Sequence, residues 1–174
     1  MKLTSIPISK PRIQKRVKQL AKELNDTYAG KELVVICVMN GAMLFCADVF
    51  RELTMKAKLD SIKVSSYKGC VSSGRPQFVE NLKIDINGKH VLIIDDILDT
   101  GNTLSMIYKY FFDKGPASIA TCVLLDKKEK RVTPFEAEYV GFSIPDEFAI
   151  GYGLDYNEDF RNLPFVGAKH FPFG

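Results

Sequence analysis

One stretch of the chain concentrates the residues whose types and spacing could do chemistry. In residues 91–103 an apolar run leads into two adjacent carboxylates, Asp95 and Asp96, and a third, Asp99, follows in a short loop. The run Thr-Gly-Asn-Thr at residues 100–103 then opens a helical pattern. A helix start offers unpaired N–H groups and the positive end of the helix dipole, which favour a phosphate. The stretch therefore predicts a phosphate seat beside carboxylates that could accept hydrogen bonds from sugar hydroxyls or steer a metal.

Other interpretations of this stretch are open. Asp95 and Asp96 could merely end a strand, and Asp99 or Thr100 could cap a helix, although adjacent acids after an apolar strand repel each other. The D-D-x-x-D pattern also suits a prenyl-diphosphate metal motif, but that motif belongs on a helix of an all-helical fold, and the residues before it here are β-type. The chain has no G-x-x-x-x-G-K-[ST] phosphate loop and no G-x-G-x-x-G after a strand.

The elements that must position these residues follow from hydrophobic periodicity. Apolar residues at helical spacing predict helices over about 11–25 and 42–53, and a third that starts at the Thr-Gly-Asn-Thr run and ends at Gly115-Pro116. Continuous apolar runs predict buried strands over 33–39, 90–94 and 118–125, and alternation predicts strands around 62–66 and 82–86, on either side of a Gly/Ser-rich loop at 68–77. Strands that alternate with helices imply a mainly parallel sheet covered on both faces. Ligands of such sheets bind beyond the carboxyl ends of the strands.

Composition narrows the class of protein. The 174 residues suit a single domain, and 46% hydrophobic and 26% charged residues are ordinary for a globular chain. A net charge of +3 is too small to argue for a nucleic-acid or membrane-surface partner. No apolar run is long enough for a transmembrane helix, the N-terminus lacks a secretory pattern, and four scattered cysteines without C-x-x-C predict reduced thiols in the cytoplasm.

The stretch around Asp95 closely resembles the phosphoribosyl-pyrophosphate (PRPP) loop of type I phosphoribosyltransferases, specifically the hypoxanthine-guanine enzymes, and further segments match in order from about Ile8 to Val166. The resemblance implies the type I phosphoribosyltransferase α/β fold in one domain, 1–174. A central, mainly parallel sheet is flanked by helices, with the core at about 30–130 and a small hood from about 1–10 and 140–174. It implies transfer of the 5-phosphoribosyl group from PRPP to N9 of hypoxanthine or guanine, giving IMP or GMP plus pyrophosphate. It further implies Mg²⁺ as cofactor, a homodimer or homotetramer, and no nucleic-acid or membrane partner.

The resemblance also implies residue roles. Asp99 manages a proton at N7 of the purine, and Ser66-Tyr67 belongs to a lid that folds over pyrophosphate. The residues implied in PRPP and phosphate binding are Asp95, Asp96, Thr100, Gly101, Asn102, Thr103, Asn40, Gly41 and Arg161. Those implied at the purine are Lys127, Phe148, Ala149 and Leu154, and those at the metal are Asp155, Asp95 and Asp96.

One departure from the family pattern and two alternative functions qualify this expectation. The loop Met39-Asn40-Gly41-Ala42 matches a pyrophosphate loop that often contains a non-proline cis peptide, but many family members have Lys where this chain has Asn40. The main rival function is a non-catalytic regulator that senses PRPP or nucleotides, which would need neither Asp99 nor the segment 148–161. An enzyme of the same family that prefers xanthine is a further alternative.

Overall fold

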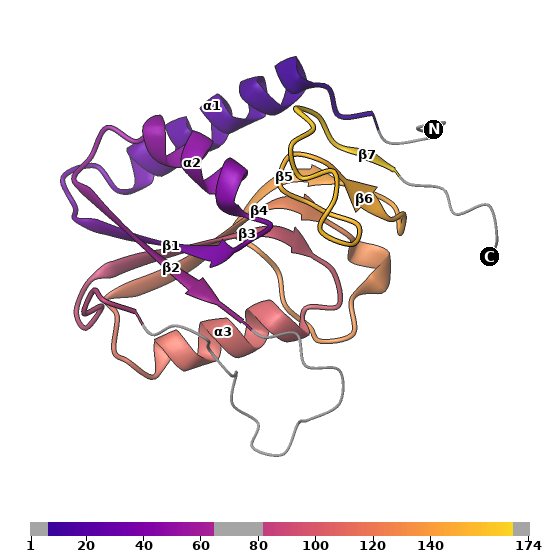
Figure 1. The fold of residues 1–174 in the computed structure, drawn as a ribbon. Helices are drawn as coiled ribbons and strands as arrows, with labels where there is room; N and C mark the ends of the chain where they lie inside the picture. The colour runs from indigo at the N-terminus through magenta and orange to yellow at the C-terminus, as the bar shows by residue number, and fades with distance from the viewer. Residues whose placement is uncertain (1–6, 65–81, 169–174) are drawn as a thin grey trace.

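The computed structural model describes residues 7–64 and 82–168, in which a five-stranded sheet lies between helices (Figure 1). No helix in these ranges is long and apolar enough to cross a membrane. The elements in chain order are α1 (Lys10–Thr27), β1 (Leu33–Met39), α2 (Met43–Arg51), β2 (Ala57–Lys63), β3 (His90–Leu98), α3 (Asn102–Phe112), β4 (Ser118–Asp126), the 3₁₀ helix η1 (Lys128–Lys130), β5 (Tyr139–Ser143), β6 (Ala149–Ile150) and β7 (Gly167–Ala168).

All neighbouring strands of the large sheet are parallel, in the order β2-β1-β3-β4-β5. The chain order reverses direction between β1 and β3, which are hydrogen-bonded neighbours although β2 separates them in sequence. Parallel strands bring their carboxyl ends to one edge, and a crevice forms outside the point where the order reverses. The loops after β1 and β3 therefore meet there.

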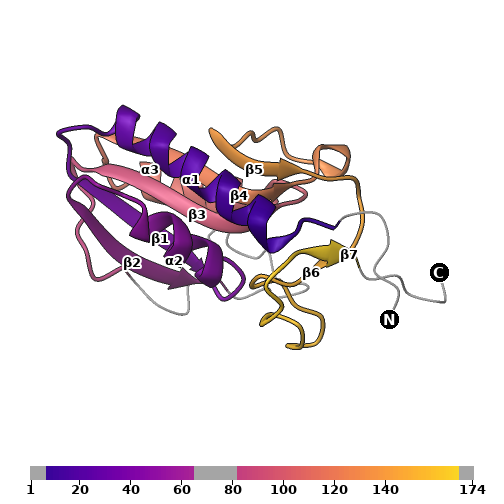
Figure 2. The ribbon, with the colours of Figure 1, turned by 90° about the horizontal axis from the view of Figure 1, so that it is seen from above.

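Two helices cover one face of the sheet and one covers the other (Figures 1 and 2). The inward sides of α1 and α2 pack in one apolar cluster with Val35 and Cys37 of β1. The alternate residues Val34 and Ile36 pack with α3 in a second cluster. Successive strand side chains point to opposite faces, which is why a strand buried on both faces reads as a continuous apolar run.

A small antiparallel sheet, β6–β7, lies beside the carboxyl edge of the large sheet (Figure 2). Ile8, just before α1, exchanges backbone hydrogen bonds with Val166 at 2.9 and 3.1 Å, so the two ends of the described chain come together. β5 extends the large sheet to Tyr139–Ser143, past residue 130 where the predicted core ended.

The predicted mainly parallel sheet flanked by helices is confirmed. The strand predicted at 33–39 is β1, and the three predicted helices agree with α1, α2 and α3 to within a few residues. The strand predicted around 82–86 is wrong. The backbone N–H groups of Lys83 and Ile84 donate to the Asp60 carboxylate at 2.7 and 2.9 Å instead of to a strand, while Ile86 is buried.

Candidate active site

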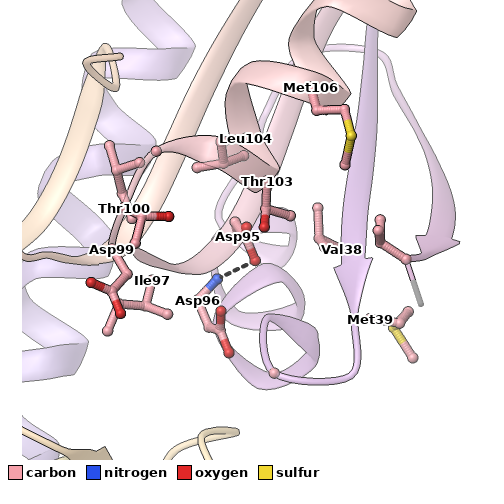
Figure 3. A pocket seen from close by; sticks show the side chains of 14 residues that line it. Val38, Met39, Asp95, Asp96, Ile97, Asp99, Thr100, Thr103, Leu104 and Met106 are labelled. Carbon is pink, nitrogen blue, oxygen red and sulfur yellow. Dashed lines mark hydrogen bonds between the residues drawn. The ribbon is translucent and has the colours of Figure 1, made fainter. Parts of the chain in front are cut away.

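A cavity of about 420 Å³ opens at the carboxyl edge of the sheet, between the loops after β1 and β3 (Figure 3). Three acids that the sequence singled out, Asp95, Asp96 and Asp99, lie along it. Of the other predicted phosphate-binding residues, the lining includes Gly41, Thr100, Gly101 and Thr103. The remaining lining residues are Val38, Met39, Val64, Ile97, Leu98, Leu104 and Met106.

The sequence suggested that Asp95 and Asp96 follow the end of a strand, but β3 continues through both to Leu98. The strand goes on because β4 still pairs with it, with Asp95 opposite Val123 and Leu98 opposite Asp126. Strand pairing fixes the positions of the acids more tightly than a loop would.

Asp95 and Asp96 carry an electrostatic cost in this position. Burial raises the pKa of Asp95 well above its usual value, and the neighbouring charge of Asp96 raises it further. Burial also raises the pKa of Asp96, although hydrogen bonds with the Asp95 side chain and the backbone, and to a smaller extent the Arg161 guanidinium, counteract part of this effect. The Asp96 backbone N–H donates a hydrogen bond of 2.9 Å to Asp95 Oδ1 (Figure 3). Hydroxyl donors or a cation placed between these carboxylates would lower that cost.

The start of α3 borders the same cavity. Gly101 lies immediately before the helix with a φ of +86°, a left-handed conformation that glycine adopts readily. A side chain there would also collide with Thr133, whose carbonyl oxygen would lie 2.6 Å from an added Cβ. Because α3 has eleven residues, its first turn presents the N–H groups and dipole of a full helix to an anion.

The loop after β1 reaches the cavity through Gly41. The peptide bond Met39–Asn40 is cis, as the resemblance implied. An added Cβ on Gly41 would lie 1.6 Å from Asp96 Oδ2, and one on Gly153 would lie 2.1 Å from the Gly41 carbonyl oxygen. Gly41 is therefore enclosed between the acid pair and a segment more than a hundred residues later in the chain.

Asp99 belongs to a group of charged residues next to the cavity. Its Oδ1 is buried, and no group in the described residues donates a hydrogen bond to it. Its Oδ2 lies 3.9 Å from Lys130 Nζ, which also approaches Asp146 Oδ1 at 3.2 Å. Lys127, almost fully buried, lies 3.6 Å from the same Asp146 oxygen. Lys127 is thus linked to Asp99 through Asp146 and Lys130.

The predicted purine residues near the C-terminus lie on the small sheet and the turn after it. Ala149 is buried in β6 and Leu154 is buried in the turn. The Phe148 ring is 44% exposed and meets Tyr156 edge to face, with the ring centres 5.8 Å apart. None of the three is among the residues that line the 420 Å³ cavity.

Asp155 and Arg161 form an ion pair with an Oδ1–Nη2 distance of 2.9 Å. Arg161 also donates to the Gly153 carbonyl oxygen at 2.7 Å, which attaches it to the segment that encloses Gly41. Neither residue lines the cavity, and neither do Asn40, Asn102 or Lys127. The Asn102 side chain accepts a hydrogen bond from Thr133. Ser66 and Tyr67 lie outside the described residues.

Sequence reasoning missed several residues around the site. No role was assigned to Arg131 from the sequence, but its guanidinium is nearly buried and donates to Asp126 and to the carbonyl oxygens of Leu98 and Asp99. Tyr152 donates a hydrogen bond from its hydroxyl to Asp48 of α2. For the Asp126–Arg131 pair, the one local signal in the sequence was an acid, Asp126, at the end of a buried strand.

Comparisons with known proteins agree with this geometry. The family model "Phosphoribosyl transferase domain" matches residues 8–157. A hypoxanthine-guanine phosphoribosyltransferase of Aquifex aeolicus is 48% identical over 88% of both chains. A hypoxanthine phosphoribosyltransferase of Salmonella typhimurium is 39% identical over 93% of both. A crystal structure of a hypoxanthine-guanine phosphoribosyltransferase from Bacillus anthracis superimposes with a TM-score of 0.91 at 38% identity, covering 97% of this chain and 100% of that one. The chain therefore belongs to the phosphoribosyltransferase family, in its hypoxanthine-guanine group.

Proposed function

We propose that this chain is a purine-salvage enzyme that transfers the 5-phosphoribosyl group of PRPP to N9 of hypoxanthine or guanine and releases pyrophosphate. One observation carries the assignment. The acid pair Asp95–Asp96, the acid Asp99 and the start of α3 border a single cavity at the reversal point of a parallel sheet. A phosphate seat and sugar-binding acids for PRPP and a proton-handling group for the purine would thus lie close enough for the two substrates to react.

PRPP would bind across the two loops. Its 5′-phosphate suits the start of α3, where Thr100 and Thr103 offer hydroxyl donors and Gly101 allows close approach of the backbone. The ribose hydroxyls would then donate to Asp95 and Asp96. Pyrophosphate would lie toward Gly41, close enough to the segment around Arg161 for that guanidinium to stabilise the departing charge.

Magnesium is the proposed cofactor, and the acid pair fits it. Asp95 and Asp96 supply hard carboxylate oxygens, which Mg²⁺ prefers, and a divalent cation would offset the burial and repulsion that raise the pKa of Asp95. Asp155 would have to share its carboxylate with Arg161, which lies 2.9 Å away. When bound, Mg²⁺ would neutralise charge on the leaving pyrophosphate.

The purine would lie between Asp99 and Lys127, with the exposed ring of Phe148 available for stacking. The ribosyl C1 becomes cationic as pyrophosphate departs, and N9 of the purine attacks it. Asp99 would accept the N7 proton that the purine loses as the bond between N9 and C1 forms, and its Oδ1 has an open acceptor position in the described structure. Its negative charge also stabilises the developing ribosyl cation. No covalent intermediate with the enzyme is needed.

Steady-state rates with PRPP, Mg²⁺ and each of hypoxanthine, guanine, xanthine and adenine test the assignment. Asp99→Asn should lower kcat by roughly 10²–10⁴, the range for a positioned acid or base. PRPP affinity should persist, because the acid pair and the start of α3 are untouched. A parent chain that binds PRPP without turnover would support a regulator, and normal turnover of Asp99→Asn would remove Asp99 from the mechanism.

Lys127 is the proposed reader of the 6-oxo group. An ammonium has three donors and no acceptor, so it gains a charge-assisted bond to a 6-oxo group and faces another donor in adenine. Sites of this kind can reject the mismatched analogue by roughly 10⁴. Lys127→Gln should narrow the ratio of kcat/KM between hypoxanthine and adenine while PRPP affinity changes little. An unchanged ratio would exclude Lys127 from this role.

The predicted homodimer or homotetramer remains a proposal. Light scattering on the purified chain tests it directly, and a monomer at micromolar concentration would contradict it.

A further inference from the structure

Behind the cavity, a buried ion pair joins Asp126, the last residue of β4, to Arg131, which follows η1. The side chains are 1% and 11% exposed. Neither residue lines the cavity. Burying two charges is costly even when they pair, and such a pair often adds little net stability over well-packed apolar residues. Its position therefore calls for an explanation other than stability.

Arg131 extends from this pair to the backbone of the loop that bears Asp99. Its Nη1 donates to the Leu98 carbonyl oxygen at 3.2 Å and also to the carbonyl oxygen of Asp99. Its Cδ would lie 3.0 Å from a Cβ added to Gly101. One side chain thus meets Leu98 at the end of β3 and two of the three residues, Asp99 and Gly101, that connect β3 to α3.

The backbone after Arg131 completes the same contact. The N–H groups of Val132 and Thr133 both donate to the Thr100 carbonyl oxygen, at 2.9 and 3.0 Å, and the Lys127 N–H donates to the Leu98 carbonyl oxygen at 2.9 Å. Every carbonyl from residue 98 to residue 100 is therefore bonded to the segment 127–133, which we call the brace.

The direction of these bonds matters for the cavity. In a trans peptide unit the C=O and the following N–H point in opposite directions. Carbonyls held toward the brace turn the N–H groups of the next residues away from it. The same bonds keep the carbonyl oxygens, which would repel an anion, out of the phosphate seat. The Arg131 side chain thereby helps to determine which way the N–H groups of Asp99 and Thr100 point, and the Val132 and Thr133 amides do the same for Gly101.

We propose that Arg131, oriented by Asp126, is the positioning residue that holds the Asp99 loop and the phosphate seat in their reactive geometry. The inference rests on the proposed function for its kinetic consequences, because Arg131 does not line the cavity and would act only through the loop that does. Asp126 holds the Arg131 guanidinium in place, and the hydrogen bonds from the brace to the carbonyls of residues 98–100 then hold the loop.

Three variants of the pair and one control variant distinguish an effect on loop position from an effect on stability. Arg131→Met should lower kcat about 10²-fold, the size of effect expected when reacting groups move by about 1 Å. Arg131→Lys keeps a charge beside Asp126 but lacks the planar guanidinium that reaches two carbonyls. Compared with Arg131→Met, it should therefore recover much of the parental melting temperature but little of the parental kcat. The double variant Asp126→Leu/Arg131→Met replaces the pair by apolar residues. It should melt within a few degrees of the parent and still show the reduced kcat.

Arg16→Met is the matched control. Arg16 also donates to two backbone carbonyls, those of Val140 at 2.7 Å and Gly141 at 3.2 Å, and pairs with Glu23, but it lies on α1, away from the cavity. Its loss should lower the melting temperature and leave kcat unchanged. A double variant with parental kcat, or kcat values that simply follow melting temperature across all four variants, would overturn the proposal.

Hydrogen exchange provides a readout that does not depend on turnover. The Val132 and Thr133 amides should exchange faster in Arg131→Met than in the parent, while amides in α1 should not change. If the parent fails to transfer phosphoribosyl groups, the proposed function fails but the exchange result still tests the brace. Unchanged exchange in Arg131→Met, with an active parent and an unchanged kcat, would refute the brace alone.

Discussion

The loops after β1 and β3 border the same cavity but are held in place by different means. The β1 loop is held by close contact, since Gly41 has the Asp96 carboxylate on one side and Gly153 on the other, with no room for a side chain. The β3 loop is held by hydrogen bonds from the brace, above all those of Arg131. The β1 loop should therefore be displaced when a substitution adds a side-chain group, and the β3 loop when a substitution removes a hydrogen-bonding group.

Addition of a methyl group at Gly153 should have the largest effect. Gly153 has a φ of +103°, and its added Cβ would lie 2.1 Å from the Gly41 carbonyl oxygen. Backbone strain and overpacking together should lower the free energy of unfolding by roughly 2–6 kcal/mol. Displacement of the Gly41 loop should also lower kcat/KM by about 10² or more. Urea unfolding and steady-state kinetics on Gly153→Ala measure both.

Gly30→Ala is the control for this prediction. Gly30 has a φ of +72° but nothing within 4 Å of an added Cβ. It should show only the backbone strain, roughly 1–3 kcal/mol, with parental kinetics. Equal effects of the two substitutions would mean that the close contact with Gly41 does not hold the loop.

Removal of Asp126, the acid that pairs with Arg131 of the brace, should have the next largest effect. Asp126→Leu alone leaves the Arg131 charge buried without its partner, which should cost roughly 3–5 kcal/mol of unfolding free energy. The double variant Asp126→Leu/Arg131→Met should regain most of that stability. Urea unfolding of the two proteins gives the comparison, and a single variant as stable as the double would contradict the buried-charge explanation.

Tyr152 gives a smaller, polar contribution to the β1 side. Tyr152 directly precedes Gly153 in sequence, and its hydroxyl donates to the Asp48 carboxylate of α2. A hydrogen bond to a charged group contributes about 1.5–3 kcal/mol, so Tyr152→Phe should lower the unfolding free energy by about that amount. Tyr139→Phe removes an exposed hydroxyl bond of 3.3 Å to Thr27 and should change it by less than about 0.5 kcal/mol. Similar losses of unfolding free energy in both variants would mean that the hydrogen bond to Asp48 makes no special contribution to stability.

The acid pair between the two loops predicts the smallest effect, which depends on pH. Burial, with the charge of Asp96, raises the pKa of Asp95 above the ordinary value of 3.8. An acid with a raised pKa in the folded state contributes stability below its unfolded pKa and loses it as pH rises through the folded value. Asp95→Asn should therefore melt a few degrees higher than the parent at pH 7 in metal-free buffer, since about 1 kcal/mol shifts the melting temperature by roughly 2–4 °C at this size. The difference should vanish near pH 4, and a difference independent of pH would contradict the ionisation cost.

The alternation of elements was predictable from the sequence because it depends on local patterns. The run at 33–39 predicts β1, and the spacing of Ile13, Val17 and Leu20 predicts α1, since burial on one or both faces determines which positions must be apolar. Between Asp95 and Thr103 the sequence singled out the three acids, Thr100, Gly101 and Thr103, which line the cavity, because a strand, a loop and a helix start lie consecutively in the chain; it did not single out Ile97 and Leu98, which line it too. Their roles come from the family resemblance and stay predictions.

Tertiary structure alone decided how that stretch is held. Strand β3 continues through both acids because β4 pairs with it, and the alternation at 82–86 forms no strand because Asp60 takes up its N–H groups. Arg131 reaches the carbonyl of Asp99 across 32 residues of sequence, and Gly153 closes on Gly41 across a still longer interval. Periodicity reports which face of an element is buried, but not which distant backbone group a side chain will meet, because that depends on the packing of the whole chain.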